Sequence, residues 1–241
     1  MSTTTAEQAL GPGAFVDSLF AWQAQAVQRP KLWEAILSGQ ASKGAVAAFL
    51  KEKFFLHWHS EPEIAAMVAL AKDRDTMMAL AKNFSREAGF YQTENHTELY
   101  VQFCEAFGLT RSELIGHTPL PETIGAFYTV SYFRRSSMEE AVASFSLASE
   151  GRKRAPQGEG SGALKQSEAF MKHYGLAERD VLFWSIHEGE VEDEDIATGI
   201  ELVKRFISSP DQQRRARHAF QMTTLTKQHM YEACDRFLTI A

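Results

Sequence analysis

The stretch Phe183–Val203, FWSIHEGEVEDEDIATGIELV, has the most unusual composition in the chain. His187 opens an acidic run in which six carboxylates occupy the next eight positions. On an ideal helix of about 3.6 residues per turn, Glu188, Glu192 and Asp195 share one face. Carboxylates on one stripe repel each other, and a divalent or trivalent metal ion would offset that repulsion because hard cations bind carboxylate oxygens.

A solvated helix face is the ordinary explanation of such a run. Here apolar side chains flank it on both sides, which favours a largely buried helix. They are Val181, Leu182, Phe183, Trp184 and Ile186 before the run, and Ile196, Ile200, Leu202 and Val203 after it. From this stretch alone, a solvated face and a metal site both remain open.

The chain as a whole has the composition of an ordinary globular protein, with 241 residues, 44% hydrophobic and 23% charged. Apolar residues recur at helical spacing between proline and glycine breaks, and no alternating strand pattern appears. We therefore expect an all-α fold, a single helical bundle of about seven main helices over residues 13–241. Residues 1–12 are expected to form a flexible tail, and the glycine-rich, basic segment 151–162 a mobile surface loop.

Charge and cysteine content exclude several classes of protein. A net charge of -6 argues against nucleic acid as a partner, which would need a basic face. No run of about 18 apolar residues exists, so we expect no membrane span. Cys104 and Cys234 are the only cysteines and form no C-x-x-C arrangement, which indicates neither a disulfide framework nor a thiolate zinc site. A cytoplasmic location is the simplest expectation.

Common catalytic motifs are absent. The chain contains no glycine-rich phosphate loop, no G-x-S-x-G elbow and no H-E-x-x-H zinc motif. The Glu-x-x-His pairs of ferritin-like di-iron bundles are also missing. What remains is a set of histidines and carboxylates on three separate predicted helices: Glu87 with His96, Glu150, and His187 with its acidic neighbours.

Glu87 and His96 are nine residues apart, which would place them on opposite sides of one continuous helix. They converge only if the chain unwinds between them. Gly89 permits such a break, because glycine tolerates the backbone conformations that end a helix.

The order of landmarks along residues 14–205 resembles the heme-oxygenase-like helical superfamily. The relevant branch contains pyrroloquinoline quinone synthase C, thiaminase II and the non-heme di-iron oxidases. The landmarks are Pro30–Trp33, Gly39, Ala48–Leu50, Phe54–Phe55, Asn83–Glu87, His96–Tyr100, Ala106–Leu109, His173–Leu176, Phe183–Trp184 and His187. The resemblance implies a helical bundle and a homodimer.

The resemblance also implies a set of iron ligands. In the di-iron members, a Glu and a His come from one segment, another Glu comes from the next long helix, and a His-x-x-x-Asp-x-x-His helix follows near the end. The first pair resembles Glu87 and His96, the next ligand resembles Glu150, and the first late histidine resembles His187.

After His187 the sequence departs from the family pattern. The positions four and seven residues later are Val191 and Glu194 instead of Asp and His. A π-bulge would accommodate one extra residue and bring Glu192 and Asp195 to the matching positions. The second metal position would then have an oxygen ligand in place of the final histidine, and a site with one metal or none is the alternative.

The resemblance implies an oxygen-dependent non-heme iron oxidase or oxygenase, with two Fe ions and O2. Its substrate would be a small metabolite such as an amino acid or fatty acid derivative. We expect Tyr128, Tyr132 and Arg134 to bind the substrate, because an aromatic helix that ends in a guanidinium could hold a carboxylate.

Two alternatives keep the fold and drop the metal. In a cofactorless enzyme of the synthase C or thiaminase type, His57, His59 and His187 would act as acid-base groups, because histidine titrates near neutral pH. His57 and His59, two positions apart, point to different helix faces and are interpreted here as pocket or core residues. The other alternative is a non-enzymatic helical binding protein, whose acidic run is a solvated face.

Overall fold

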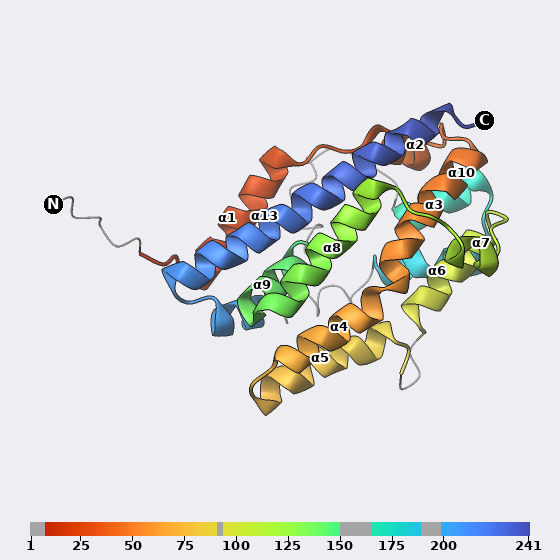
Figure 1. Ribbon diagram of the computed structural model, residues 1–241. Coiled ribbons are helices and arrows are strands. Elements are labelled where there is room, and N and C mark those ends of the chain that lie inside the picture. The colour runs from red at the N-terminus through yellow and green to blue at the C-terminus, as the bar shows by residue number, and fades with distance from the viewer. Residues whose placement is uncertain (1–7, 91–93, 150–164, 189–198) are drawn as a thin grey trace.

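The structure is a computed structural model that describes residues 8–90, 94–149, 165–188 and 199–241. Every regular element within these ranges is a helix, which confirms the all-α prediction (Figure 1). Among the described residues, eight α-helices have nine or more residues: α1, α3, α4, α5, α6, α8, α10 and α13. This agrees roughly with the expected seven main helices.

The helices follow one another with short connections. In chain order they are α1 (Pro12–Ala26), α2 (Lys31–Ser38), α3 (Lys43–Trp58), α4 (Ser60–Leu70), α5 (Arg74–Glu87), α6 (His96–Glu105), α7 (Arg111–Ile115), α8 (Pro121–Ser136), α9 (Met138–Val142), the π-helix η1 (Ala143–Leu147), α10 (Gln166–Tyr174), the 3-10 helix η3 (Glu178–Val181), α11 (Leu182–Ile186), helical residues 199–206, α13 (Pro210–Ala233) and the 3-10 helix η4 (Cys234–Thr239).

Local sequence sets many of the helix boundaries. Ser209 caps α13 by accepting a hydrogen bond from the backbone of Gln212, whose side chain bonds back in a capping box. Thr110 starts α7 in the same way with Glu113. At the other end of a helix, Gly39 stops α2 with a φ of 73°, in the left-handed region that favours glycine.

Helix α13 runs along the length of the bundle and organises one of two buried clusters (Figure 1). It packs against α8, α9 and η1, with α1 beside it. The second cluster joins α2, α3, α6, α10 and α11 at the end of the molecule where the C-terminus lies. Aromatic side chains such as Phe49, Phe103 and Phe170 fill this second cluster.

The π-helix η1 meets the helical residues 199–206 at very close range. A Cβ atom built on Gly199 would lie 2.8 Å from Ser146 Cβ, closer than such carbons approach in real structures. Gly199 therefore allows the two backbones to pack together. The π-bulge proposed after His187 falls on residues outside those that the structure describes, as does the predicted loop 151–162.

The structure bears on the expected membrane spans and disulfide bonds. In the described part of the chain, no helix is long and apolar enough to cross a membrane. Cys104 and Cys234 are both buried and free, so the prediction of no disulfide framework is confirmed.

Candidate metal centre

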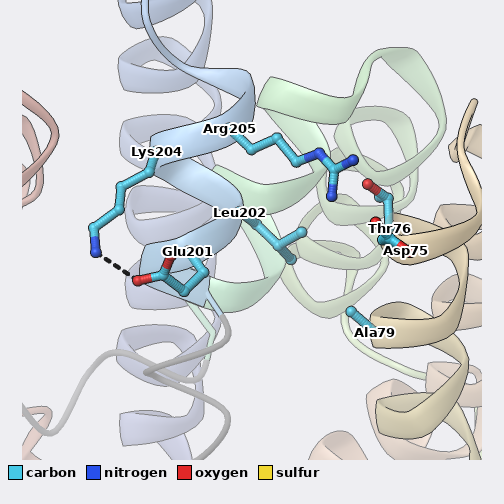
Figure 2. A pocket seen from close by; sticks show the side chains of 7 residues that line it. All are labelled: Asp75, Thr76, Ala79, Glu201, Leu202, Lys204 and Arg205. Atoms are coloured by element: carbon cyan, nitrogen blue, oxygen red, sulfur yellow. Dashed lines mark hydrogen bonds and ion pairs between the residues drawn. The ribbon is translucent and has the colours of Figure 1, made fainter.

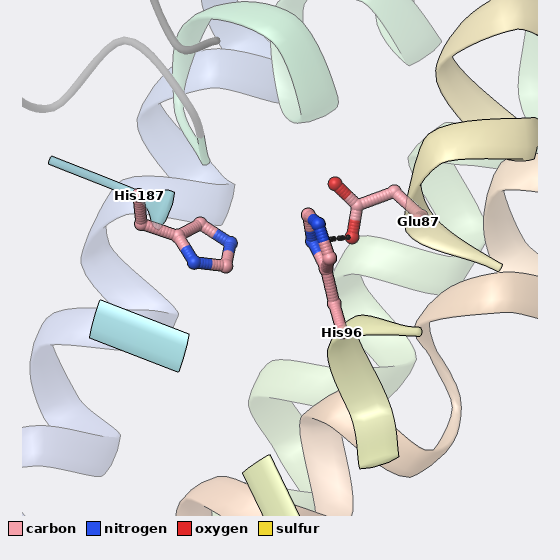
Figure 3. A group of neighbouring side chains, drawn as sticks. All are labelled: Glu87, His96 and His187. Atoms are coloured by element: carbon pink, nitrogen blue, oxygen red, sulfur yellow. Dashed lines mark ion pairs between the residues drawn. The ribbon is translucent and has the colours of Figure 1, made fainter. Parts of the chain in front are cut away.

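Three side chains from three separate helix ends converge on one point inside the bundle (Figure 3). Glu87 is the last residue of α5, His96 is the first of α6, and His187 directly follows α11. One carboxylate oxygen and one nitrogen from each imidazole all lie within 4.8 Å of one another. The convergence of these three predicted ligands is the central feature of the site.

The connection between α5 and α6 brings Glu87 and His96 together. Gly89 ends α5 with a φ of 72°, and a Cβ there would lie 2.6 Å from the backbone nitrogen of Asn95. Asn95 caps α6, and its side-chain amide donates to the carbonyl oxygen of Ala88 at 3.1 Å. The predicted break in the helix is thus confirmed, and Glu87 and His96 lie in contact although nine positions separate them.

Glu87 and His96 are in close contact and both are mostly buried. Glu87 Oε2 lies 2.9 Å from His96 Nδ1, and the side chains are 18% and 14% exposed. Burial by itself would raise the pKa of Glu87. The neighbouring His96, and then His187, outweigh burial and hold this pKa below its ordinary value. The carboxylate is therefore ionised and available as a ligand at neutral pH.

His96 Nδ1 has no aligned hydrogen-bond partner among the described residues, although it is buried and near Glu87. A buried nitrogen without a partner costs about 1–3 kcal/mol, and such atoms occur where a ligand or ion is bound. The short contact without hydrogen-bond alignment is the geometry expected of two ligands that aim at a common third atom.

The orientation of His187 is set by its own helix. Its Nδ1 lies 2.5 Å from the carbonyl oxygen of Phe183, which can only accept, so Nδ1 donates the hydrogen. Burial lowers the pKa of His187 to about 4, so the ring is neutral at pH 7. The lone pair of Nε2 is then free for a metal, and a backbone carbonyl on the other nitrogen is the usual arrangement for a histidine ligand.

One carboxylate and two imidazoles match the ligand set that binds non-heme ferrous iron with open positions. The charge of Glu87, the orphaned nitrogen of His96 and the tautomer of His187 all suit a divalent cation. The residues present therefore fit an iron ion. Other divalent metals accept the same donor atoms, so the ligand set alone does not choose among them.

A second group of side chains lies beside the candidate ligands. The His57 ring packs at 4.5 Å on Tyr100 and at 4.9 Å on Phe183, and its Nε2 lies 2.9 Å from Lys53 Nζ. Burial, then Lys53 and His187, lower the pKa of His57 well below its ordinary value. His59 packs instead on Phe55 and Phe127. The two histidines thus face different sides of the helix end, as expected.

The predicted substrate-binding residues do not lie together. Tyr128 and Tyr132 are 66% and 63% exposed on the outer face of α8, whereas Arg134 is only 6% exposed. The Arg134 guanidinium lies 4.7 Å above the ring of Phe145 and 3.5 Å from Ser149 Oγ. Only Arg134 of these three thus lies in the interior.

The remaining predicted ligands, Glu150, Glu192 and Asp195, lie outside the described residues. Glu188, the first carboxylate of the acidic run, is described and has a structural role. Its two oxygens accept hydrogen bonds from the backbone nitrogen and the hydroxyl of Ser167, at 3.0 and 2.6 Å, and so hold the first turn of α10. Lys53 was not predicted, although its position four residues before His57 is the spacing of neighbours on a helix face.

Two surface hollows lie apart from this centre. Figure 2 shows one of about 340 Å³ between the start of α5 and residues 199–206, lined by Asp75, Thr76, Ala79, Glu201, Leu202, Lys204 and Arg205. The other, of about 550 Å³, is lined by residues around Tyr174 and Arg179. Neither lining includes a candidate ligand, and both are open and charged, so neither is part of the site.

Comparison with known proteins supports an iron-related interpretation. A family model described as iron-containing redox enzyme matches residues 47–227, a range that includes all three converging ligands. No curated protein sequence matches the chain significantly.

Solved structures resemble the whole chain at low sequence identity. A TenA homologue from Pseudomonas syringae has a TM-score of 0.75 at 14% identity, covering 98% of this chain and 100% of that one. A CADD-like protein of unknown function from Nostoc punctiforme has a TM-score of 0.73 at 16%, covering 93% and 97%. A domain of unknown function with a heme oxygenase-like fold from Shewanella denitrificans has a TM-score of 0.69 at 13%, covering 92% and 88%. These likenesses show that the fold is heme oxygenase-like.

Proposed function

The chain belongs to the family of iron-containing redox enzymes, and on that premise we propose that it is an oxygen-dependent non-heme iron oxidase or oxygenase. Its substrate is a small metabolite, such as an amino acid or fatty acid derivative. The observation that carries the proposal is the convergence of Glu87, His96 and His187, whose ligand atoms lie within 4.8 Å of one another. The donor types suit ferrous iron and leave positions open for other ligands.

Each residue of the centre has a separate task. Glu87 supplies a negative charge, and His96 and His187 supply nitrogen ligands. The carbonyl of Phe183 keeps the His187 lone pair directed into the site. Tyr100 and Phe183 pack around His57 and exclude water from this side. When bound, iron would supply one-electron and dioxygen chemistry.

A second iron position is part of the proposal. Glu150, Glu192 and Asp195 would complete it, since the resemblance to di-iron oxidases assigns the remaining ligands to these positions. The test is the iron content per chain. Two irons in the unchanged protein and one in an Asp195→Asn variant would support the second position. One iron in both would show that the three converging residues make the whole site.

A cofactorless enzyme of the thiaminase type is the second candidate. It is favoured by the likeness in fold to TenA homologues and by two half-buried histidines, His57 and His187, whose lowered pKa values keep them neutral so that they can act as bases. A thiol nucleophile is not supported, because burial raises the pKa of Cys104 and raises that of Cys234 to about 12.

Metal analysis separates the two candidates. The protein is purified after growth with added iron, and iron per chain is measured. Metal-free protein is then supplied with ferrous iron, and oxygen consumption is followed with a panel of amino acids and fatty acids. The oxidase proposal expects bound iron and oxygen uptake that depends on one substrate class. Absence of both would overturn it and favour the cofactorless enzyme.

A matched pair of variants tests the site itself. Glu87→Gln keeps the shape of the side chain and removes its charge, so it should lose most of the iron. Glu98→Gln is the control, because Glu98 lies on the outer side of α6 and pairs with Arg111 there. Equal iron loss in both variants would contradict the assignment of Glu87.

A further inference from the structure

The buried indole of Trp184 lies one aromatic ring away from the candidate metal centre. Trp184 is 5% exposed and lies in α11, three residues before His187. The ring of Phe183 contacts both side chains. Its centre lies 4.5 Å from the ring centre of His187 and 5.2 Å from that of Trp184. A single benzene ring thus separates a candidate iron ligand from an electron-rich indole.

The indole nitrogen of Trp184 is buried and has no hydrogen-bond partner among the described residues. Buried donors without a partner are uncommon in folded proteins, and a redox role is one explanation for them. If this indole loses an electron, no neighbouring group accepts its proton. The ring then keeps a positive charge inside an apolar cluster. A charge is costly there, so transfer of the charge to a better solvated ring is favourable.

Trp33 of α2 is a ring that can take over this charge. Its centre lies 5.6 Å from that of Trp184. The other rings that contact Trp184 within the described part of the chain are those of Phe103, Phe170 and Phe183. Phenylalanine is much harder to oxidise than tryptophan, because its ring carries no electron-donating heteroatom. Trp33 is only partly buried at the edge of the same cluster, so water can solvate the charge and accept the indole proton.

Tyr100 is a second oxidisable ring beside Phe183, with 4.9 Å between the ring centres. Its side chain is fully buried, and its hydroxyl donates a hydrogen bond to the carbonyl oxygen of Leu50 at 3.2 Å. Oxidation of a phenol at neutral pH requires loss of the phenol proton, and a backbone carbonyl is too weak a base to take it. Tyr100 is therefore a poorer electron donor than Trp184 in this setting.

We propose that Trp184 and Trp33 form an electron path between the metal centre and the protein surface. The path supplies single electrons when the centre reacts with dioxygen in the absence of substrate. This inference rests on the proposed function, because iron together with dioxygen is the oxidant. Its consequence is protection of the site, since an oxidant without substrate would otherwise attack the nearest oxidisable side chains, among them the imidazoles of His96 and His187.

The transfer takes place in three one-electron steps. The oxidised centre first takes one electron from Trp184, which becomes an indole radical cation. Trp33 then gives one electron to Trp184 and loses its N–H proton to water, which leaves a neutral radical on Trp33. A small reductant in solution, such as ascorbate, finally gives one electron and one proton to Trp33. Both tryptophans are restored, and the centre has gained one electron.

The position of oxidation damage tests the path. Iron-loaded protein is exposed to dioxygen without substrate or ascorbate, and oxidised tryptophans are located by peptide mass spectrometry. Oxygen addition should concentrate on Trp33. Trp58 is the internal control, because it is 40% exposed and its ring contacts only that of Phe54 among the described residues. An oxidant that diffuses through solution would reach Trp58 more readily, so equal or greater oxidation of Trp58 would overturn the proposal.

Electron paramagnetic resonance of rapidly frozen samples gives a second readout. The unchanged protein should show a neutral indole radical, identified by the change in hyperfine splitting when the tryptophan rings are deuterated. Trp33→Phe and Trp184→Phe should each lose this signal, whereas Trp58→Phe should keep it. Trp33 is partly exposed, so its variant keeps the test decisive if Trp184→Phe fails to fold. A neutral indole radical that persists in Trp33→Phe would contradict the path.

Iron content and oxygen uptake separate failure of the path from failure of the proposed function. Trp33→Phe should hold as much iron as the unchanged protein, and oxidation of the peptides that contain His96 and His187 should increase in this variant. Normal iron content and oxygen uptake without an indole radical would overturn the path and leave the proposed function standing. An unchanged protein that binds no iron would overturn the proposed function, and the path with it, because no oxidant would remain.

Discussion

The Nδ1 atom of His187 lies 2.5 Å from the carbonyl oxygen of Phe183, one helical turn earlier. This contact fixes both the tautomer and the direction of the ring, and it leaves Nε2 as the only nitrogen with a lone pair. The ring centres of His96 and His187 lie 4.8 Å apart. A histidine so oriented is pre-organised to bind a metal in the folded, metal-free chain.

Replacement of His187 by alanine should therefore weaken iron binding more than about 100-fold, since loss of a ligand exceeds the 10–100-fold effect of an outer partner. Titration of ferrous iron into metal-free protein measures this change. His229→Ala is the control, because His229 is exposed on α13 and outside the candidate site. Equal affinity in the two variants would exclude His187 as a ligand.

The stability of the metal-free protein should depend on pH through the same residue. Burial lowers the pKa of His187 to about 4, whereas the pKa of a histidine in an unfolded chain is about 6.5. Between these values the unfolded state binds more protons, so the free energy of unfolding falls as the pH falls from about 6.5 to 4. Above about 6.5 this contribution is fully present. The pKa of His57 is shifted in the same direction.

Urea unfolding at a series of pH values measures this effect as a change in the denaturation midpoint. Between pH 4 and 6.5 the midpoint should depend less steeply on pH in His187→Ala, because one of the two histidines with a lowered pKa is removed. The pKa of Glu87 is also held low, so part of the loss of stability on acidification remains in that variant. A slope that His187→Ala leaves unchanged would contradict the lowered pKa.

Local signals explain why much of the fold was predictable. Helix stops at Gly39, Gly89 and Gly175 coincide with positive φ angles of 73°, 72° and 72°, which few other residues adopt readily. The cap at Ser209 is equally local, because it needs only four consecutive residues. The convergence of Glu87 with His96 required just the break at Gly89. Such features depend on neighbours in sequence and so are visible there.

Features that depend on packing between distant helices were missed. Phe49 and Tyr231 are 182 residues apart in the sequence, and no local pattern indicates that their rings lie 5.6 Å apart. Tyr128 and Tyr132 were expected in the pocket, yet they are exposed while the neighbouring Phe133 is buried. Aromatic residues occupy several faces of α8. Tyrosine has an apolar ring and a polar hydroxyl, so it occurs both in the interior and at the surface.

A buried carboxylate on α3 should be important for stability. Glu52 is 1% exposed and accepts hydrogen bonds from His117 Nε2 at 2.7 Å, Leu120 N at 3.0 Å and Thr123 Oγ1 at 2.5 Å. Glu52→Gln replaces one accepting oxygen by an N–H group that faces another donor. We expect a loss of about 2–4 kcal/mol in the free energy of unfolding.

Chemical denaturation measures the effect of Glu52→Gln, and Glu105→Gln serves as its control. Glu105 is exposed at the end of α6, so its substitution should change stability by less than about 0.5 kcal/mol. If the two substitutions had the same effect, the hydrogen bonds of Glu52 would contribute nothing to holding the start of α8 against α3.

The contact between Gly199 and the π-helix η1 gives the last prediction. A Cβ at position 199 would meet Ser146 Cβ at 2.8 Å, and that atom cannot move without its backbone. Gly199→Ala should therefore lower the free energy of unfolding by about 1–3 kcal/mol, as overpacking does elsewhere.

Gly125→Ala in α8 is the matched control, because nothing lies within 4 Å of its Cβ position. There alanine should instead stabilise the helix by about 0.5–1 kcal/mol, since it is the better helix former. Thermal unfolding of both variants measures whether each substitution lowers or raises the stability of the protein. Stabilisation by both substitutions would show that residues 199–206 do not pack on η1 as closely as Ser146 and Gly199 imply.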